Sequence, residues 1–278
     1  MVDSPSGRKY LRARRGVILA CGGFIHNRQM LVQHAPHLAR CSVPWGGAGD
    51  QGDGINMGIA VGAASLRMDE GFAVAPIYPP ENTISGILVN ASGQRFISED
   101  SYHAVIGHRI AYEQQGTAWL ITDEGSTYQG VQDNFPLAAQ SSSIGGLAEQ
   151  LSLPRGALQN TVAYYNRYAD KREDPMFGKS AEYLRPLQGP PYKAWDISVD
   201  RAFFPAHTLG GLATTVNGEV IGSFGELIPG LFAVGRTTAG IPTAPYIASG
   251  LSVGDATFFG RRAGRVAVGL APYAGGGA

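Results

Sequence analysis

The chain has 278 residues, 44% of them apolar, which is enough to build one large domain or two smaller ones around a sizeable core. Its 22 basic and 22 acidic residues give no net charge, and this balance argues against a nucleic acid or a membrane surface as a partner. The two cysteines are too few for a disulfide scaffold and indicate a cytoplasmic location, and no apolar run approaches the roughly 20 residues of a transmembrane helix.

The first part of the chain contains short apolar segments separated by glycine-rich turns. Residues 8–20 predict a β-hairpin arm followed by a buried strand at 16–20, which stops at the glycine pair 22–23. The stretch HNRQMLVQHAP predicts a helix, and GDQGDGINMGIAVGAA predicts a glycine-rich loop that opens a second helix from about Ile55. With 39 glycines and 17 prolines in the whole chain, we expect a loop-rich α/β or α+β protein.

The middle of the chain combines strand and helix signals. Residues 84–97 predict two strands joined by a turn, and Ser98 is expected to cap a helix over about 101–115, followed by the strand AWLITD. Another helix is predicted in ALQNTVAYYNRYADK, with four residues at helical spacing on one face: Leu158, Val162, Tyr165 and Ala169. Residues 171–192 are rich in proline, glycine and charge, so we expect a long surface loop there.

The last part alternates again between strands and turns. GGLATTVNGEVIG predicts a hairpin that turns at Asn217-Gly218, and GLFAVG predicts a buried strand. SGLSVGDATFFGRRAGRVAVGLA predicts a closing helix, and residues 272–278 are expected to form a frayed tail.

Two of these apolar strands, the one at 16–20 and the one in GLFAVG, end in glycine close to a predicted helix N-terminus. Strand ends of this kind hold dinucleotides in α/β sheets, because glycine lets backbone N–H groups approach phosphates and the helix dipole favours negative charge. Tight structural turns would explain the same glycines. The residues alone leave both interpretations open.

Several segments carry recognisable motifs: VILACGGF (17–24), GDGINMGIAVGA (52–63), ILVNASGQRFISE (87–99), PPYKA (190–194), HTLGGL (207–212), IPGLFAVG (228–235) and GLSVGDATFFGRRAG (250–264). In this order, the chain resembles the C-terminal half to two-thirds of the fumarate reductase/3-ketosteroid dehydrogenase superfamily of FAD-dependent oxidoreductases. The opening strand–GxGxxG–helix unit of that superfamily has no counterpart upstream of Arg8. The resemblance therefore implies an N-terminally truncated chain.

The fold implied by the resemblance is α/β: an N-terminally truncated, Rossmann-like FAD-binding domain with an inserted α+β substrate cap domain. Residues 1–70 and 203–278 would form the FAD-binding domain, and residues 71–202 would form the cap. The implied cofactor-binding residues follow the two strands or open the helices: Ala20, Cys21, Gly22, Gly23, Asp53, Gly235, Arg236, Gly250, Leu251 and Ser252.

Two of these residues have a second interpretation or depart from the superfamily. Asp53 would either cap a helix or accept a hydrogen bond from a ribityl or ribose hydroxyl. Arg236 stands where many relatives carry a glutamate that binds the ribose or ribityl chain of FAD.

The residues before the final helix separate the subfamilies. Fumarate reductases carry a substrate-binding arginine there, and the aligned residue of this chain is Ile247, which cannot pair with a dicarboxylate. Ketosteroid dehydrogenases carry a tyrosine, three residues and a glycine, which match Tyr246 and Gly250. The resemblance implies that the Tyr246 hydroxyl and the Gly250 N–H stabilise the enolate oxygen of a ketone. The alternative for Tyr246 is an aromatic residue that packs beneath a loop.

The proton acceptor implied by the resemblance is Tyr102, just after RFISED. Because a free tyrosine titrates at about pH 10, this role needs a neighbour that acidifies its proton. A solvated hydroxyl on an amphipathic helix is the alternative. His207, in HTLGGL, resembles the histidine that touches the substrate carboxylate in fumarate and related ene reductases, and it is otherwise a structural hydrogen-bonding residue.

We therefore expect an FAD-dependent oxidoreductase that dehydrogenates a carbon–carbon bond next to a ring ketone, with 3-ketosteroids as the substrate class and a separate electron acceptor. Apolar residues of the expected cap fit a bulky hydrophobic substrate: Phe72, Ile77, Tyr78, Ile84 and Ile87. Two alternatives stay open, a flavin-dependent ene reductase that uses His207 and a fragment that binds no FAD.

A metal site is not expected. His34, His37 and Cys41 have the spacing H-x2-H-x3-C, but no fourth ligand follows at a suitable distance along the chain.

Overall fold

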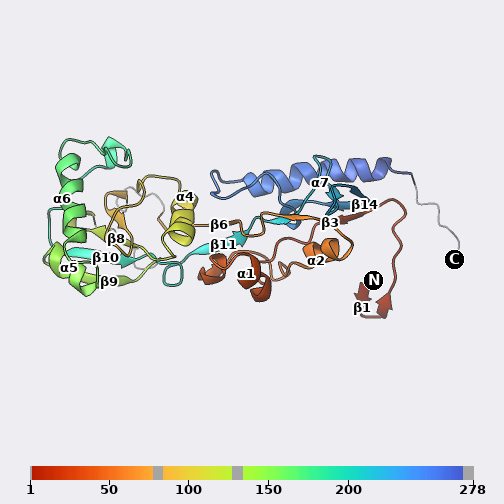
Figure 1. The fold of residues 1–278 in the computed structure, drawn as a ribbon, viewed down its shortest axis with the longest axis horizontal. Coiled ribbons are helices and arrows are strands. Elements are labelled where there is room, and N and C mark those ends of the chain that lie inside the picture. The colour runs from red at the N-terminus through yellow and green to blue at the C-terminus, as the bar shows by residue number, and fades with distance from the viewer. Residues whose placement is uncertain (1, 78–83, 127–133, 272–278) are drawn as a thin grey trace.

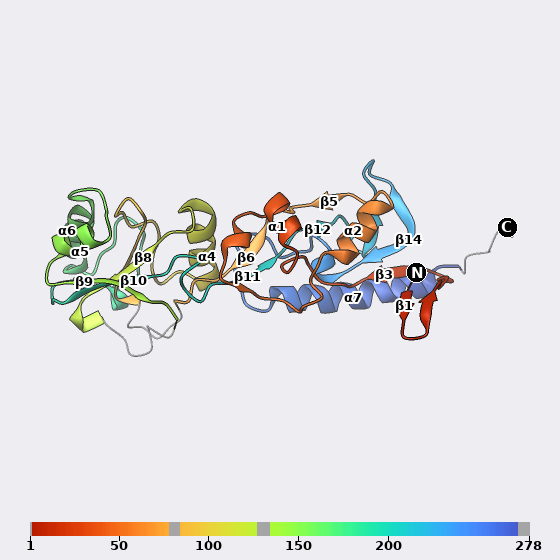
Figure 2. The same ribbon diagram turned by 90° about the horizontal axis from the view of Figure 1, so that it is seen from below.

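The computed structural model describes residues 2–77, 84–126 and 134–271, and it shows an elongated molecule (Figure 1). One end carries α6 (Ala157–Ala169), and the other end carries the longest helix, α7 (Leu251–Gly269), which lies along one side of that end (Figure 2). A small hairpin of β1 (Val2–Ser4) and β2 (Gly7–Lys9) projects from the α7 end of the molecule and lies away from α7 itself (Figure 1). In the described part of the chain, no helix has the length and apolar character needed to cross a membrane.

A four-stranded antiparallel sheet occupies the α6 end of the molecule. Its strands, in spatial order, are β7 (Ile87–Val89), β8 (Trp119–Thr122), β10 (Tyr192–Asp196) and β9 (Leu137–Ser141). α5 (Ile144–Gln150) and α6 pack against this sheet and share one hydrophobic core with it. The α6 residues Leu158, Val162, Tyr165 and Ala169 are all buried, so the helical face predicted from their spacing is confirmed.

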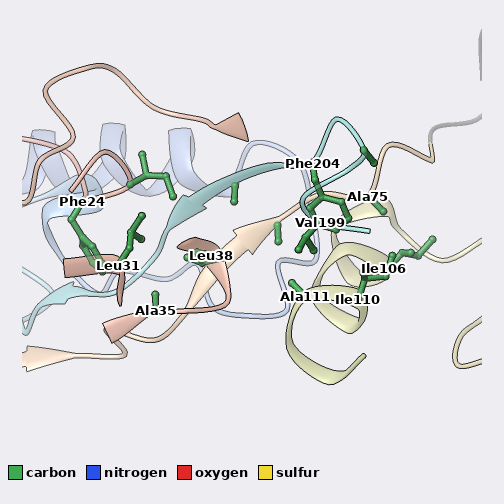
Figure 3. Close-up of a cluster of buried hydrophobic side chains, with 14 of the residues drawn as sticks. Phe24, Leu31, Ala35, Leu38, Ala75, Ile106, Ile110, Ala111, Val199 and Phe204 are labelled. Atoms are coloured by element: carbon green, nitrogen blue, oxygen red, sulfur yellow. The ribbon is translucent and has the colours of Figure 1, made fainter. Parts of the chain in front are cut away.

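The middle of the molecule is a three-stranded sheet with a helix packed on it. β11 (Pro205–Thr208) runs parallel to β4 (Val43–Pro44) and antiparallel to β6 (Gly71–Ala73). α4 (His103–His108) contacts β6 and continues as a π-helix over Arg109–Glu113. A hydrophobic core crosses this region, from Phe24 and Leu31 on one side to Ile106 and Phe204 on the other (Figure 3).

The α7 end is built around a parallel strand pair. β14 (Leu227–Ala233) pairs in parallel with β3 (Val17–Leu19) and antiparallel with β13 (Glu219–Ile221). α7 packs on β14 through a small core that includes Phe232, Val234 and Ala263. The remaining elements are α1 (Arg28–His34), η1 (Leu38–Arg40), α2 (Asp53–Ala60), β5 (Ser65–Leu66), η3 (Glu124–Ser126), η5 (Ala181–Tyr183), β12 (Gly211–Leu212) and η6 (Gly235–Thr237).

Two expectations for the segment after β7 are wrong in detail. The hydroxyl of Ser98 does not cap α4 but donates to Asp100, and Tyr102 occupies the N-cap position without a capping hydrogen bond from its side chain. The second predicted strand of 84–97 is reduced to a bridge between Val89 and Arg95, and the Arg95 side chain binds Glu99 in a buried ion cluster.

The strand expected at 16–20 is present as β3, but it is not buried throughout. Leu19 is buried, whereas Val17 is 48% and Ile18 is 39% exposed. In the described sheet β3 is an edge strand, which pairs with β14 on one side. The hairpin at Asn217-Gly218 is confirmed by a bridge between Thr214 and Val220. The expected frayed tail at 272–278 lies outside the described residues, as does Tyr78.

A buried cluster of four charged side chains lies beneath the predicted surface loop 171–192. The Arg95 guanidinium binds Glu99 at 2.8 Å and Asp174 at 3.0 Å, and the Lys179 ammonium lies 3.2 Å from Glu99 and donates to the Gly86 carbonyl at 2.8 Å. Each of the four side chains is at most 3% exposed. The loop prediction is therefore wrong for Asp174 and Lys179, because their charges are satisfied inside the fold.

Replacing Glu99 should destabilise the fold strongly. Glu99→Gln leaves two buried cations with one carboxylate, and removing one partner of such a cluster costs about 3–5 kcal/mol of unfolding free energy. Glu113→Gln is the matched control, because it breaks the exposed pair with Arg109 and should cost less than about 1 kcal/mol. Urea unfolding measures both, and equal losses would show that the buried cluster adds no stability.

Candidate active site

The carboxyl ends of β3 and β14 meet, because the two strands run in parallel. Ala20 to Gly23 follow β3, and Gly235 and Arg236 follow β14. The Thr237 hydroxyl joins the two segments by accepting from the Cys21 N–H at 2.9 Å and donating to the Gly22 carbonyl at 3.1 Å. These predicted cofactor-binding residues therefore lie together.

Close contacts within the protein account for the glycine at position 22. Gly22 has φ 77°, and a Cβ added there would lie 1.9 Å from the Asp50 carboxylate. That carboxylate forms an ion pair with Arg236, the residue that stands in place of the superfamily's glutamate. Sequence reasoning missed Asp50, because its partner lies 186 residues further along the chain.

Asp53 is the first residue of α2 and is exposed, and its neighbour Gly54 packs against this strand junction, where an added Cβ would lie 3.0 Å from the Cys21 Cβ. The N-cap of α2 is Gly52, with φ 81° and no side-chain hydrogen bond. The interpretation of Asp53 as the capping residue is therefore wrong.

A cavity of about 440 Å³ lies between β6, β11, the start of α4 and the start of α7. Its apolar wall consists of Trp45, Phe72, Val74, Pro76, Phe203, Pro205 and Val253. Its polar groups are Tyr102, His103, Asn134, His207, Tyr246, Ser249, Gly250 and Ser252. The predicted residues Tyr102, His207, Tyr246 and Gly250 are thus brought to one cavity.

Other residues predicted to bind the substrate do not line this cavity. Ile77 and Ile87 belong to hydrophobic cores and Ile84 is also buried, so only Phe72 of the described apolar residues expected for the substrate lines the cavity. Ile247 is 68% exposed and also does not line it. Trp45 and Phe203, which do line it, were missed because they lie on loops without a periodic pattern.

The Tyr246 hydroxyl lies at the N-terminus of α7. It accepts a hydrogen bond from the Ser252 N–H at 2.8 Å and donates to the Ser252 hydroxyl at 3.2 Å, and its ring packs edge-on against Phe72. Gly250 is the N-cap of this 19-residue helix, with φ 90°. The first amides of a helix and its dipole favour negative charge, so this corner of the cavity can stabilise an anionic oxygen.

The Tyr102 hydroxyl is hydrogen-bonded to the Ser249 hydroxyl at 2.7 Å, and either oxygen can be the donor. Ser249 lies in the loop that carries Tyr246, so this bond joins the α4 side of the cavity to the α7 side. Sequence reasoning missed Ser249. Its position between the two predicted site residues Tyr246 and Gly250 could have identified it as a candidate site residue.

His207 lies between the aromatic rings of the cavity. Its ring stacks on Phe72 at 4.6 Å and meets Tyr246 edge-on at 6.2 Å, and its buried Nε2 has no hydrogen-bond partner among the described residues. Burial lowers the pKa of His207 to about 3, and the charge of Arg236 acts in the same direction. The imidazole is therefore neutral at pH 7 and does not offer a positive charge to a substrate carboxylate.

Among the residues that the structure describes, no group of three histidine, cysteine, aspartate or glutamate side chains could hold a metal ion. Within the H-x2-H-x3-C pattern, burial raises the pKa of the Cys41 thiol to about 12, so this thiol is protonated at neutral pH.

The neutral state of His207 predicts a pH dependence of stability. Between its ordinary pKa of 6.5 and its folded pKa of about 3, the unfolded chain binds a proton that the folded chain does not, so stability falls as the pH falls through this window. His207→Phe should show a weaker fall in unfolding free energy between pH 7 and about pH 4. Phe72→Leu is the control, because it alters the same stack without removing a titratable group, and parallel curves for wild type and His207→Phe would contradict the assignment.

The chain is similar to known proteins. A family described as FAD binding domain matches residues 1–252. An NADH:acrylate oxidoreductase of Vibrio harveyi is 31% identical over 283 residues, which are 92% of this chain and 27% of the relative. A 3-oxosteroid 1-dehydrogenase of Mycobacterium tuberculosis is 29% identical over 294 residues, which are 90% of this chain and 52% of the relative.

A crystal structure of the 3-ketosteroid-Δ4-(5α)-dehydrogenase of Rhodococcus jostii RHA1 in complex with 4-androstene-3,17-dione is also similar. It superposes with a TM-score of 0.82 at 40% sequence identity, over 92% of this chain and 53% of that one. The chain thus spans about half the length of these steroid dehydrogenases, and about a quarter of the acrylate oxidoreductase. With the family matching 252 of its 278 residues, this chain belongs to the FAD binding domain family, and its cofactor is FAD.

Proposed function

We propose that this chain carries the ketone-binding site of an FAD-dependent dehydrogenase that introduces a double bond next to a ring ketone, with 3-ketosteroids as the substrate class. One observation carries the proposal. A hydroxyl at a helix N-terminus, Tyr246, and a hydrogen-bonded hydroxyl pair, Tyr102 and Ser249, lie in the same apolar cavity.

Tyr246 and the start of α7 stabilise the ketone oxygen as it becomes an enolate. The Ser252 N–H already donates to the Tyr246 oxygen, which leaves the hydroxyl proton of Tyr246 to donate to the substrate. In the absence of substrate that proton is directed to the Ser252 hydroxyl. A ketone oxygen takes its place and meets the positive end of the α7 dipole.

Tyr102 takes the α-proton. Tyr102 accepts this proton as the phenolate, having lost its own proton to solvent before the substrate binds, and it becomes a neutral hydroxyl in the step. The Ser249 hydroxyl, 2.7 Å away, can donate to the phenolate oxygen and stabilise it, so Ser249 is the neighbour that this role of Tyr102 needs. The electron pair of the broken C–H bond stays on the substrate as the enolate, which Tyr246 and the helix N-terminus stabilise.

The residues at the strand junction fit the ring end of FAD. Ala20 and Cys21 are exposed, and a Cβ added at Gly54, in the first turn of α2, would lie 3.0 Å from the Cys21 Cβ, so small exposed residues lie beside a helix N-terminus. Such a surface accommodates a flat, electron-rich ring system. We assign the holding of this ring to Ala20, Cys21, Gly235 and Leu251, and bound FAD would supply the acceptor for the hydride.

We also propose that the chain is divided into an FAD-binding part and a cap. Residues 1–70 and 203–278 form the FAD-binding part, and residues 71–202 form the cap. In support, the four-stranded sheet with α5 and α6 is built entirely within residues 87–196.

The lining of the cavity supports a hydrophobic, uncharged substrate. Aromatic and proline side chains form most of its wall, and the imidazole of His207 is neutral. The alternative, reduction of a carboxylated enoate, needs a cation for the carboxylate, and at the position of the fumarate reductase arginine this chain has the exposed residue Ile247. The similarity to steroid dehydrogenases points to the same substrate class. A separate electron acceptor then reoxidises the flavin.

Removing either hydroxyl should slow steroid oxidation. In the FAD-loaded protein, Tyr246→Phe should lower kcat/KM for a 3-ketosteroid by about 10²–10³-fold, because one donor to the developing oxyanion is lost. Tyr102→Phe should lower kcat by about 10²–10⁴-fold, because the proton acceptor is lost. Tyr10→Phe is the control, since Tyr10 is exposed and distant from the cavity lining. Full turnover in Tyr246→Phe would refute the proposed ketone site.

Substrate preference separates the two enzyme classes, and the absorbance spectrum tests the fragment alternative. The purified protein should show the absorbance bands of bound flavin and should oxidise a 3-ketosteroid faster than it reduces an α,β-unsaturated carboxylate. The opposite preference would establish the reductase, and a protein without flavin absorbance after incubation with FAD would identify a fragment that does not bind it.

A further inference from the structure

Residues 238–250 form the loop that carries Tyr246 and Ser249, between η6 and α7, and they have no helix or strand of their own. Both proposed catalytic contacts depend on where this loop lies. Three charged side chains, two from a distant turn and one from α7, bind its backbone at Gly240, Ile241 and Ala244.

Two of these side chains come from the turn before β6. The Arg67 guanidinium donates to the Gly240 carbonyl, and the Glu70 carboxylate accepts from the Ala244 N–H at 3.1 Å. Arg67 and Glu70 also lie 3.7 Å apart as an ion pair, so each orients the other. The turn is also bound to the segment that follows β11, because the Leu209 N–H donates to the Glu70 carbonyl at 3.0 Å.

The third side chain comes from α7. Asp255 is buried, and its carboxylate accepts from the Ile241 N–H at 2.9 Å. A Cβ added at Gly240 would lie 2.6 Å from both Asp255 carboxylate oxygens, so glycine is required there for this approach. Arg67 has φ 51°, a strained conformation for a residue other than glycine, and the strain is maintained where the surrounding contacts hold the residue in place.

We infer that Arg67, Glu70 and Asp255 are positioning residues that clamp the backbone at 240–244 and so set the placement of Tyr246 and Ser249 in the cavity. The clamp binds the loop from both sides, from the turn at 67–70 and from α7, just ahead of Tyr246. Carboxylate and guanidinium bonds to backbone groups are strong and directional, which suits this role. The inference rests on the proposed function of the same site.

Hydrogen exchange tests the clamp without reference to catalysis. In Glu70→Ala and Asp255→Ala, the amides of Ile241 and Ala244 should exchange faster than in the wild-type protein. Glu70→Gln and Asp255→Asn keep an acceptor oxygen and should restore slow exchange. Gly240→Ala should reproduce the effect of Asp255→Ala without removing the charge, because its Cβ displaces the carboxylate.

Kinetics test the consequence for the site. The two alanine variants should lower kcat/KM for a 3-ketosteroid by about 10–10²-fold, the effect of misplacing catalytic groups by about an ångström. The glutamine and asparagine variants should recover most of it. Glu226→Ala is the matched control, because it removes a carboxylate bond to the Phe224 N–H in an exposed turn away from the cavity, and it should leave turnover unchanged.

The outcomes separate the two proposals. Faster exchange at 241 and 244 with unchanged kcat/KM would overturn the positioning role while leaving the proposed function intact. Unchanged exchange in the alanine variants would overturn the clamp itself. A wild-type protein that neither binds nor oxidises a 3-ketosteroid would refute the proposed function, and the positioning role with it.

Discussion

The hydrogen bond from the Ser252 amide to the Tyr246 hydroxyl connects a side chain of the cavity to the backbone of α7. The remaining cavity groups are arranged around this contact. It brings a proton donor to the positive end of a 19-residue helix, inside a wall of aromatic and proline side chains. Next to such an apolar wall an amide and a hydroxyl stabilise a developing negative charge more than they would in water.

The apolar wall also constrains which groups can carry charge. Near the cavity, the positive group Arg236 is paired with Asp50, and His207 is held neutral by burial. The ionised groups that act on the Tyr246 loop do so from outside the lining, through the loop's backbone. Because isolated charges are costly to bury, a site for an uncharged ketone can be stabilised by dipoles and neutral hydroxyls alone.

Local patterns in the sequence predicted those elements that depend on local physics. The face of α6 is set by helical spacing, and its four buried residues were all identified. The turn at Asn217-Gly218 follows from the positive φ that Gly218 adopts. The helix predicted over about 101–115 is present as α4 and the π-helix that continues it to Glu113, but its N-cap is Tyr102 and not Ser98, whose hydroxyl donates to Asp100 instead.

The candidate site divides in the same way. The sequence by itself determined that Tyr246 and Gly250 precede a helix, that Tyr102 begins one, and that glycines end two apolar strands, since each of these follows from spacing within a few residues. Only the tertiary structure decided that Ser249 meets Tyr102, that Asp50 pairs with Arg236, and that Trp45 and Phe203 enclose the cavity. These contacts join residues more than a hundred positions apart, on loops whose course is set by packing and not by periodicity.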